Sequence, residues 1–135
     1  MTQGRAVFDA SLLLRAAVVD DPAARRWTTD AEAGTVLAFA PSLVWAEVVH
    51  ALARYVRAGH LSRDDAQERL VRLLQLPIAS EPTEALALGA LPRALAAGMS
   101  GYDALYLVLA DATDATLVTA DRRLAEAASR AELIP

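Results

Sequence analysis

The chain has 135 residues, of which 55% are hydrophobic and 22% charged, so it can form one buried core and is not a disordered chain. It contains no cysteine, which excludes disulfides, thiolate-bound zinc and cysteine nucleophiles. The net charge is −4 and all 13 basic residues are arginine, which argues against nucleic-acid binding by phosphate neutralisation alone and excludes lysine-dependent chemistry.

Hydropathy predicts a single soluble domain over residues 1–135. No apolar run reaches the roughly 18 residues that cross a bilayer. The first residues also lack the pattern of a signal peptide, because Asp9 interrupts the apolar run that follows them. We therefore expect a cytoplasmic protein with no membrane contact.

The first half of the chain alternates between buried strands and helices. Residues 6–8 form an apolar run typical of a strand buried on both faces, and a short helix over 12–19 follows. Asp21-Pro22 is a helix start signal for residues 23–33, which Gly34 ends. Residues 35–40 are the second predicted strand. Ser42 is the expected N-cap of a helix over 43–58, which Gly59 closes.

The second half continues the same alternation. A return helix is expected over residues 61–76 with Ser62 as its N-cap, and then a weak strand over 77–80. The helix over 83–97 is expected to break or kink at Pro92. An apolar helix over 102–112, a strand over 115–119, a last helix over 122–130 and a short edge strand over 133–134 complete the chain. This alternation predicts an α/β fold with a parallel sheet.

Two aspartates follow predicted strands directly. Asp9 ends the first strand, and Asp121 ends the segment Leu117-Val-Thr-Ala-Asp121. The carboxyl ends of parallel strands lie at one edge of a sheet, where open α/β folds place their ligands. Each residue has a simpler explanation as the N-cap of the helix that follows it.

Glu47 lies in an apolar stripe of its predicted helix. Residues on or near its side include Leu43, Val44 and Val48. A buried glutamate is costly unless it is paired or bound to a metal. The alternatives are an ion pair with Arg54 or a position at the edge of the stripe, in contact with water.

Asp103 opens the apolar helix over residues 102–112. Ser100-Gly-Tyr-Asp103 is close to a capping box, which is its simpler explanation. The body of this helix carries no charge between residues 104 and 110, so it must be buried. We therefore expect its N-terminus to lie inside the fold.

One geometry brings all four acids together at the sheet edge. Four converging carboxylates repel one another, and a bound Mg²⁺ or Mn²⁺ relieves this repulsion because hard divalent ions prefer oxygen ligands. Such a site suits hydrolysis of a phosphodiester. The sequence therefore predicts a metal site formed by Asp9, Glu47, Asp103 and Asp121.

The chain resembles PIN-domain proteins, and specifically the VapC-type toxin ribonucleases of VapBC toxin–antitoxin systems. The resemblance covers essentially the whole chain. It rests on four segments: Val7-Phe-Asp-Ala-Ser11, Ala46-Glu-Val-Val-His-Ala-Leu52, Ser100-Gly-Tyr-Asp-Ala-Leu-Tyr-Leu-Val-Leu-Ala110 and Leu117-Val-Thr-Ala-Asp-Arg-Arg-Leu124.

The resemblance implies a PIN-like three-layer α/β/α sandwich with a central, mostly parallel sheet of four to five strands. It implies a Mg²⁺- or Mn²⁺-dependent endoribonuclease whose acidic quartet falls on the four acids named above. Ser11 and Thr119 occupy the family's hydroxyl positions, which orient carboxylates or waters. The resemblance further implies an RNA substrate, a homodimer, a cognate VapB-like antitoxin and a larger assembly with it.

Two positions depart from the family pattern. His50 stands where many relatives carry an asparagine, and Arg122 follows the fourth acid where some relatives carry another acid. A second metal is therefore expected to bind weakly or only with substrate. Arg122 is a candidate contact for RNA phosphate, whereas Arg123 is interpreted as part of a solvated helix face.

Other residues are interpreted as structural. We expect His50 to pack or to contact a partner, and His60 to be exposed in a turn. Trp27, Trp45 and the leucines of residues 61–76 fit the core, a dimer contact or an antitoxin groove equally well.

Four other classes of protein share parts of this pattern. A catalytically inactive PIN-fold module that binds protein would keep the scaffold without turnover. A haloacid-dehalogenase-like phosphatase needs Asp-x-Asp after the first strand, and Ser11 stands at its second position. A phospho-receiver domain needs a lysine, which the chain lacks, and no glycine-rich motif supports a dinucleotide site.

Overall fold

The computed structural model describes residues 4–135, which form five strands and seven helices. The strands are β1 (Gly4–Phe8), β2 (Val36–Pro41), β3 (Ile78–Glu81), β4 (Thr116–Thr119) and β5 (Ala131–Leu133). The helices are α1 (Ala10–Ala17), α2 (Pro22–Ala33), α3 (Leu43–Arg57), α4 (Arg63–Leu74), α5 (Thr83–Ala97), α6 (Gly101–Thr113) and α7 (Arg122–Ala127).

The five strands form one sheet in the order β3-β2-β1-β4-β5, and every neighbouring pair is parallel. β1 is the central strand, between β2 and β4. Its residues Ala6, Val7 and Phe8 are all 0% exposed, as the unbroken apolar run predicts. Helices cover both faces of this sheet. The predicted α/β/α sandwich with a parallel sheet is confirmed, and the sheet has five strands.

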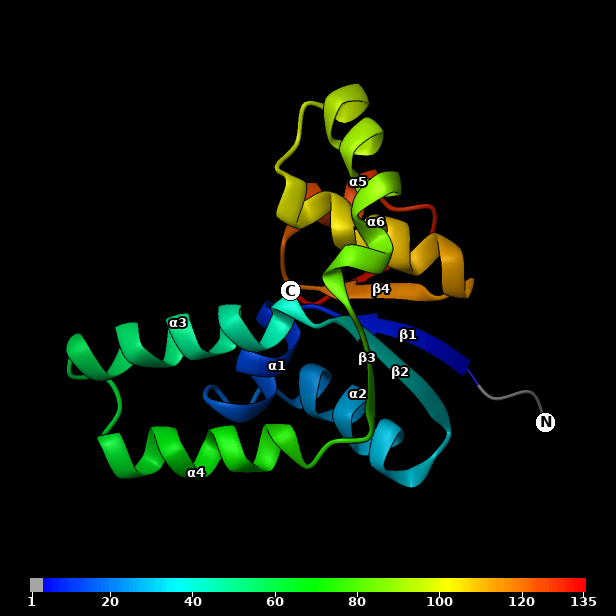
Figure 1. The fold of residues 1–135 in the computed structure, drawn as a ribbon. Coiled ribbons are helices and arrows are strands. Elements are labelled where there is room, and N and C mark those ends of the chain that lie inside the picture. Colours follow the sequence, from blue (N-terminus) through cyan, green and yellow to red (C-terminus); the bar gives the residue numbers. More distant parts are fainter. Residues whose placement is uncertain (1–3) are drawn as a thin grey trace.

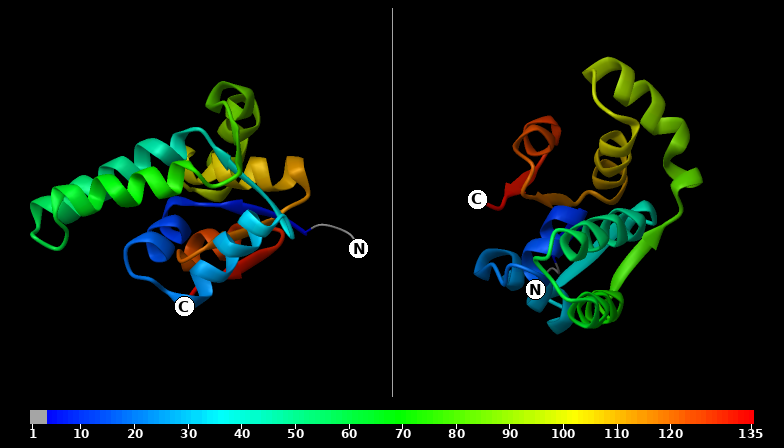
Figure 2. Two further views of the ribbon diagram at one scale, coloured as in Figure 1. Left: turned by 90° about the horizontal axis from the view of Figure 1, so that it is seen from below. Right: turned by 90° about the vertical axis from the view of Figure 1, so that its left-hand side faces the viewer.

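The helices separate into layers around the sheet (Figure 1). α1 and α2 lie on one face, while α6 packs on β1, β2 and β4 from the other face and α5 packs on α6. α3 and α4 form a hairpin that extends away from the sheet (Figure 2). Within residues 4–135, no helix is both long and apolar enough to cross a membrane.

The core follows from the hydrophobic pattern of β1 and α6. α6 buries six of its residues, and residues 104–110 are all buried apart from the half-buried Val108. Each fully buried large apolar side chain contributes about 1.5–3 kcal/mol. Phe8 meets the ring of Trp27 edge to face, with centroids 6.5 Å apart, which joins the sheet to α2.

Most predicted element boundaries lie within two residues of the observed ones. Ser42 is the N-cap residue of α3, as predicted, but its side chain makes no capping hydrogen bond; its hydroxyl accepts a hydrogen bond from the Thr83 backbone N–H at 3.3 Å. α5 continues through Pro92, so the helix does not break there. The last helix was predicted too long: α7 ends at Ala127, and residues 131–133 pair with β4 as β5. The N-cap at Ser62 is confirmed, since its Oγ accepts from the Asp65 N–H at 3.0 Å.

The aromatic and leucine residues left open by the sequence mostly pack inward. Trp27 and Trp45 are half-buried against the core. Among the leucines of residues 61–76, Leu73 is buried and Leu74 is 56% exposed, while the others are half-buried. His60 is exposed as expected, and His50 is exposed rather than packed.

Candidate active site

Asp9 lies directly after β1 and is 6% exposed, at the carboxyl edge of the sheet. It is the N-cap of α1, because its Oδ1 accepts a hydrogen bond from the Leu12 backbone N–H at 2.9 Å. The same Oδ1 accepts from Ser11 Oγ at 2.6 Å, and Oδ2 accepts from Thr119 Oγ1 at 2.5 Å. Asp9 therefore caps α1 and also lies among other polar side chains at the sheet edge.

Thr119 brings β4 to Asp9. β1 and β4 pair in a register that sets Phe8 beside Val118, so the next residues along both strands are neighbours. Thr119 is 0% exposed, and its Oγ1 also accepts from the Asp121 backbone N–H at 2.9 Å. Ser11 Oγ accepts from the Ala120 N–H at 2.9 Å and lies 3.4 Å from Thr119 Oγ1. Both hydroxyls tie Asp9 to the end of β4.

Asp121 caps α7 and is exposed. Its Oδ1 accepts from the backbone N–H groups of Arg123 at 3.0 Å and Leu124 at 3.2 Å. Its Oδ2 makes no hydrogen bond among the described residues, and its charge is close enough to raise the pKa of Asp9. Oδ1 therefore caps the helix, as the simpler explanation held, while Oδ2 is open to a ligand.

Glu47 lies on α3 and is half-buried. The alternative that Glu47 forms an ion pair with Arg54 is wrong. The Tyr106 hydroxyl on α6 donates a hydrogen bond to Glu47 Oε1 at 2.5 Å. Sequence reasoning missed Tyr106, although its position one helical turn after Asp103 was a signal that both face the same side of α6.

Asp103 lies in the first turn of α6 and is half-buried. The Ser100 hydroxyl accepts a hydrogen bond from the Asp103 backbone N–H at 3.1 Å, which is the capping interaction suggested by the sequence. The expectation that this helix end lies inside the fold was wrong, because Ser100, Gly101 and Tyr102 are exposed. The helix dips into the core only from Ala104 onward.

Asp103 and Asp121 line one open pocket of about 290 Å³. Arg123 and Glu126 also line it, and its apolar wall includes Met99 and Leu124. Asp103 also contributes to the electrostatics of Glu47, and Glu47 in turn is affected by Asp9. The four acids are therefore electrostatic neighbours around one edge of the sheet.

The electrostatics of this edge favour a cation. Burial raises the pKa of Asp9 above its usual value, and the charge of Asp121 adds to this, while hydrogen bonds from Ser11, Thr119 and Leu12 act in the opposite direction. Burial also raises the pKa of Glu47, opposed by the hydrogen bond from Tyr106 and reinforced by the charges of Asp9 and Asp103.

Tyr106 remains protonated in this setting. Its burial and the nearby Glu47 charge both raise the pKa of the phenol, so the hydroxyl acts as the donor. A positive charge at the edge would relieve the burial and repulsion that the carboxylates experience.

The donor chemistry fits a hard divalent ion, but the acids do not form a closed cage. Within residues 4–135, no three histidine, aspartate or glutamate side chains lie close enough together to enclose a metal. Mg²⁺ commonly keeps several waters and takes only one or two carboxylates together with substrate phosphate. An open edge with oxygen donors is compatible with that mode of binding.

Arg122 and Arg123 follow Asp121 and are exposed. Among the described residues neither side chain forms an ion pair, and Arg123 lines the pocket shared by Asp103 and Asp121. Their guanidinium groups are therefore available beside the acids.

A family model described as "PIN domain" matches residues 6–130. The chain belongs to the PIN-domain family. The match includes the end of β1, Glu47 on α3, the first turn of α6 and the end of β4, so all four acids lie inside the region that defines the family. No match is found among curated proteins.

Solved structures share this PIN fold. PAE2754 from Pyrobaculum aerophilum has a TM-score of 0.76 and 25% identity, covering 97% of this chain and 91% of its own. VapBC2 from Rickettsia felis, solved with a DNA fragment from its promoter, has a TM-score of 0.71, 16% identity and coverage of 97% and 99%. VapC20 from Mycobacterium tuberculosis, a sarcin–ricin loop cleaving toxin, has a TM-score of 0.70, 15% identity and coverage of 96% and 99%.

Proposed function

We propose that this PIN-domain chain is a Mg²⁺- or Mn²⁺-dependent endoribonuclease and the toxin of a type II toxin–antitoxin system. The observation that carries the proposal is Asp9. A carboxylate that is 6% exposed, bonded by two hydroxyls and surrounded by further acids is costly to keep without a cation. The family match and the VapC neighbours support a nuclease.

Each residue has a distinct proposed task. Asp9, Glu47, Asp103 and Asp121 would hold the ion. A bound ion would supply Lewis-acid chemistry: it would polarise a phosphoryl oxygen and lower the pKa of a water. Ser11 and Thr119 fix both oxygens of Asp9, so that carboxylate does not have to reorganise when charge develops on the phosphate. Arg122 would contact an RNA phosphate beside the acids.

The proposed partners follow from the same family. One structural neighbour is VapBC2 bound to a DNA fragment from its promoter, and another is VapC20, a sarcin–ricin loop cleaving toxin. For this chain we propose a VapB-like antitoxin, an RNA substrate, a homodimer and a larger assembly with the antitoxin, all in the cytoplasm.

The decisive experiment replaces two acids from different elements. Asp9→Asn and Asp103→Asn should each lower RNA cleavage with Mn²⁺ by at least about 100-fold and relieve growth arrest on induction, because each change removes a proposed metal ligand. Circular dichroism should show an unchanged fold. The exposed Glu84→Gln on α5 is the control and should cleave RNA as the parent does. Full activity in both aspartate variants would reject the quartet.

A non-catalytic PIN module that binds protein is the second candidate. It is favoured by the absence, within residues 4–135, of three ligand side chains close enough to enclose a metal. Titration calorimetry with Mn²⁺ separates the two. The nuclease proposal requires heat of binding that Asp9→Asn abolishes, whereas the module requires no carboxylate-dependent binding.

A further inference from the structure

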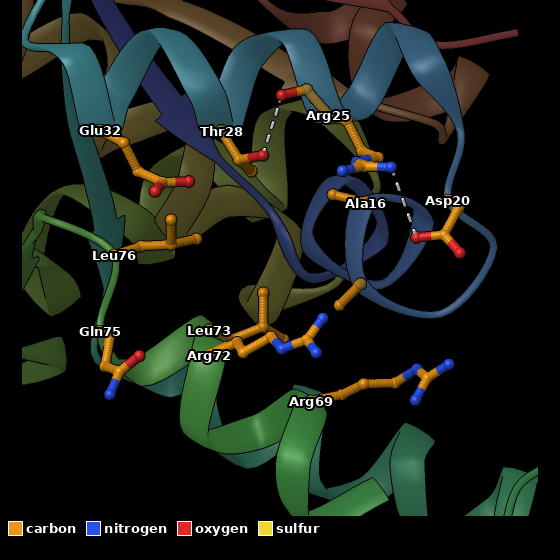
Figure 3. Close-up of a pocket in the computed structure, with 11 residues that line it drawn as sticks. Ala16, Asp20, Arg25, Thr28, Glu32, Arg69, Arg72, Leu73, Gln75 and Leu76 are labelled. Atoms are coloured by element: carbon orange, nitrogen blue, oxygen red, sulfur yellow. Dashed lines mark hydrogen bonds and ion pairs between the residues drawn. The ribbon is translucent and has the colours of Figure 1, made fainter. Parts of the chain in front are cut away.

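A second cavity lies at the opposite end of α1 from Asp9. It occupies about 240 Å³ between the last turn of α1, α2 and the C-terminal half of α4 (Figure 3). Asp9 caps the first turn of α1, while Ala16 and Ala17 of the last turn line the cavity. The eight residues of α1 rise about 12 Å, so this cavity is separate from the carboxylate edge.

Arg69 is the unusual residue of this cavity. Its Nε is buried and has no hydrogen-bond partner, and it is the one buried side-chain polar atom in that state among the described residues. Its guanidinium forms no ion pair within the same part of the chain. Buried donors are almost always bonded, so the Nε–H of Arg69 is a donor for which the described residues supply no acceptor.

Two further arginines surround the same space. Arg72 lies on α4 one turn from Arg69, and Figure 3 shows both side chains reaching into the gap between α4 and α2. Its ion pair with Glu68 at 2.6 Å joins two side chains that are 70% and 58% exposed, so it is weak and exchangeable. Arg25 approaches from α2, and its contact with Asp20 is long at 3.9 Å.

The remaining lining is apolar on one side and acidic at the rim. Ala16, Ala17, Leu73 and Leu76 form the apolar wall. Glu32 lies beside Leu76 in Figure 3 and is not within ion-pair distance of any arginine of the described chain. Three arginines face two lining acids, Asp20 and Glu32, and Glu68 pairs with Arg72 from outside the lining, so the charges balance. What distinguishes the cavity is the Nε of Arg69, which has no hydrogen-bond partner among the described residues.

We propose that this cavity binds a small phosphate monoester, with the phosphate on Arg69 and Arg72. Two adjacent guanidinium groups match a dianion with several acceptor oxygens, which satisfies the orphaned Nε and relieves the repulsion between the arginines. The apolar wall accommodates an organic group, and Glu32 accepts hydrogen bonds from its hydroxyls. The acidic rim opposes an extended polyanion. This inference does not depend on the nuclease proposal.

The test is an NMR titration of the full chain in metal-free buffer at constant ionic strength. The arginine Nε–Hε resonances are followed while inorganic phosphate or AMP is added, with chloride as the ionic control. The Arg69 signal should shift and saturate with both phosphates, and AMP should bind about tenfold more tightly because of its organic group. The arginines outside the cavity should not saturate.

Variants of Arg69 test whether phosphate binds specifically in the cavity. Arg69→Met should weaken phosphate binding by about 10–100-fold. Arg69→Lys keeps the charge but lacks the planar guanidinium that makes two parallel hydrogen bonds, and should bind more weakly than the parent. Arg63→Met, on the same helix but outside the cavity, is the matched control and should bind as the parent does.

Three results would overturn the proposal: shifts that chloride reproduces, equal affinity in the parent and Arg69→Met, or an RNA strand without terminal phosphate that binds here more tightly than AMP. The last would assign the cavity to an RNA backbone instead. Because no divalent metal is present and no cleavage is measured, none of these results bears on whether the nuclease proposal is correct.

Discussion

The two halves of the candidate active site are held in different ways. In the half built on the sheet, Asp9 is buried and every hydrogen bond to its oxygens comes from α1 or the end of β4. In the half built on helices, Glu47 is half-buried and is joined to α6 by one hydrogen bond from Tyr106. Asp103 is held at its own helix end, where its N–H donates to Ser100 Oγ. Asp121 caps α7 through Oδ1, and its N–H donates to Thr119 Oγ1 at the end of β4.

The two halves therefore differ in rigidity. The ladder between β1 and β4 fixes Asp9 to within the tolerance of a strand register, and two hydroxyls fix the orientation of its carboxylate. The helical acids depend on how α3 and α6 pack across the fold. We therefore expect Asp9 to be preorganised, and the other acids to complete the site when cation and substrate arrive.

The largest effect is expected from breaking the sheet half. Thr119→Val keeps the shape of the side chain but removes the donor to Asp9 Oδ2 and the acceptor for the Asp121 N–H. RNA cleavage should fall by about 10–100-fold. Steady-state kinetics with Mn²⁺ checks this. Thr119→Ser should recover most of the activity, and Thr116→Val on the same strand serves as the control. Unchanged cleavage by Thr119→Val would show that orientation of Asp9 is unimportant.

A smaller effect is expected from loosening the helical half. Tyr106→Phe removes the hydrogen bond that lowers the pKa of Glu47, so that pKa should rise further. The acid limb of the kcat–pH profile should move to higher pH, with cleavage about tenfold lower at neutral pH. Tyr102→Phe, on the same helix with an exposed ring, should leave the profile unmoved. A uniform loss without a shift of the limb would indicate a packing role only.

The burial of Asp9 should also be visible in stability. Its pKa is raised on folding, so the metal-free protein gains stability from the protonated form at low pH and loses it as pH rises through the folded pKa. Asp9→Asn should make the free energy of unfolding fall less steeply with pH. A smaller fall should remain, because the pKa of Glu47 is also raised on folding. Urea unfolding at pH 4 and pH 7 measures it. The exposed Glu84→Gln on α5, whose charge affects neither Asp9 nor Glu47, should keep the decline of the parent.

The smallest effect is expected outside both halves. Arg122→Ala should weaken RNA binding several-fold at low salt and reduce the slope of log affinity against log salt by about 1, because one phosphate contact is lost. Filter binding of uncleaved RNA in EDTA checks this. Arg57→Ala, on the distant end of α3, should keep the parent slope. An equal change in both variants would mean that only overall charge matters.

Much of the sheet half could be predicted from the sequence. A buried apolar strand that ends in an acid places that acid at the carboxyl edge, and parallel pairing places the end of the strand over residues 115–119 at the same edge. The prediction works because strand period and register are local properties that a pattern of apolar residues carries.

The helical half was decided by tertiary structure. Helical periodicity placed Glu47 near an apolar stripe and made an arginine on its own helix a reasonable partner. The actual partner, Tyr106, lies 59 residues away, on a helix on the other side of the site. No periodicity encodes which turn of one helix faces which turn of another, because that depends on the packing of the intervening layers.

The amino-acid sequence by itself determined the alternation of strands and helices, the parallel sheet and the position of Asp9, because burial and strand polarity follow from local hydrophobic pattern. Only the folded structure decided that Tyr106 bonds Glu47, that Asp103 opens toward the surface, and that the Nε of Arg69 is buried without a hydrogen-bond partner among the described residues. These outcomes depend on contacts between elements distant in the chain, where the cost of an unpaired charge is set by what packs around it.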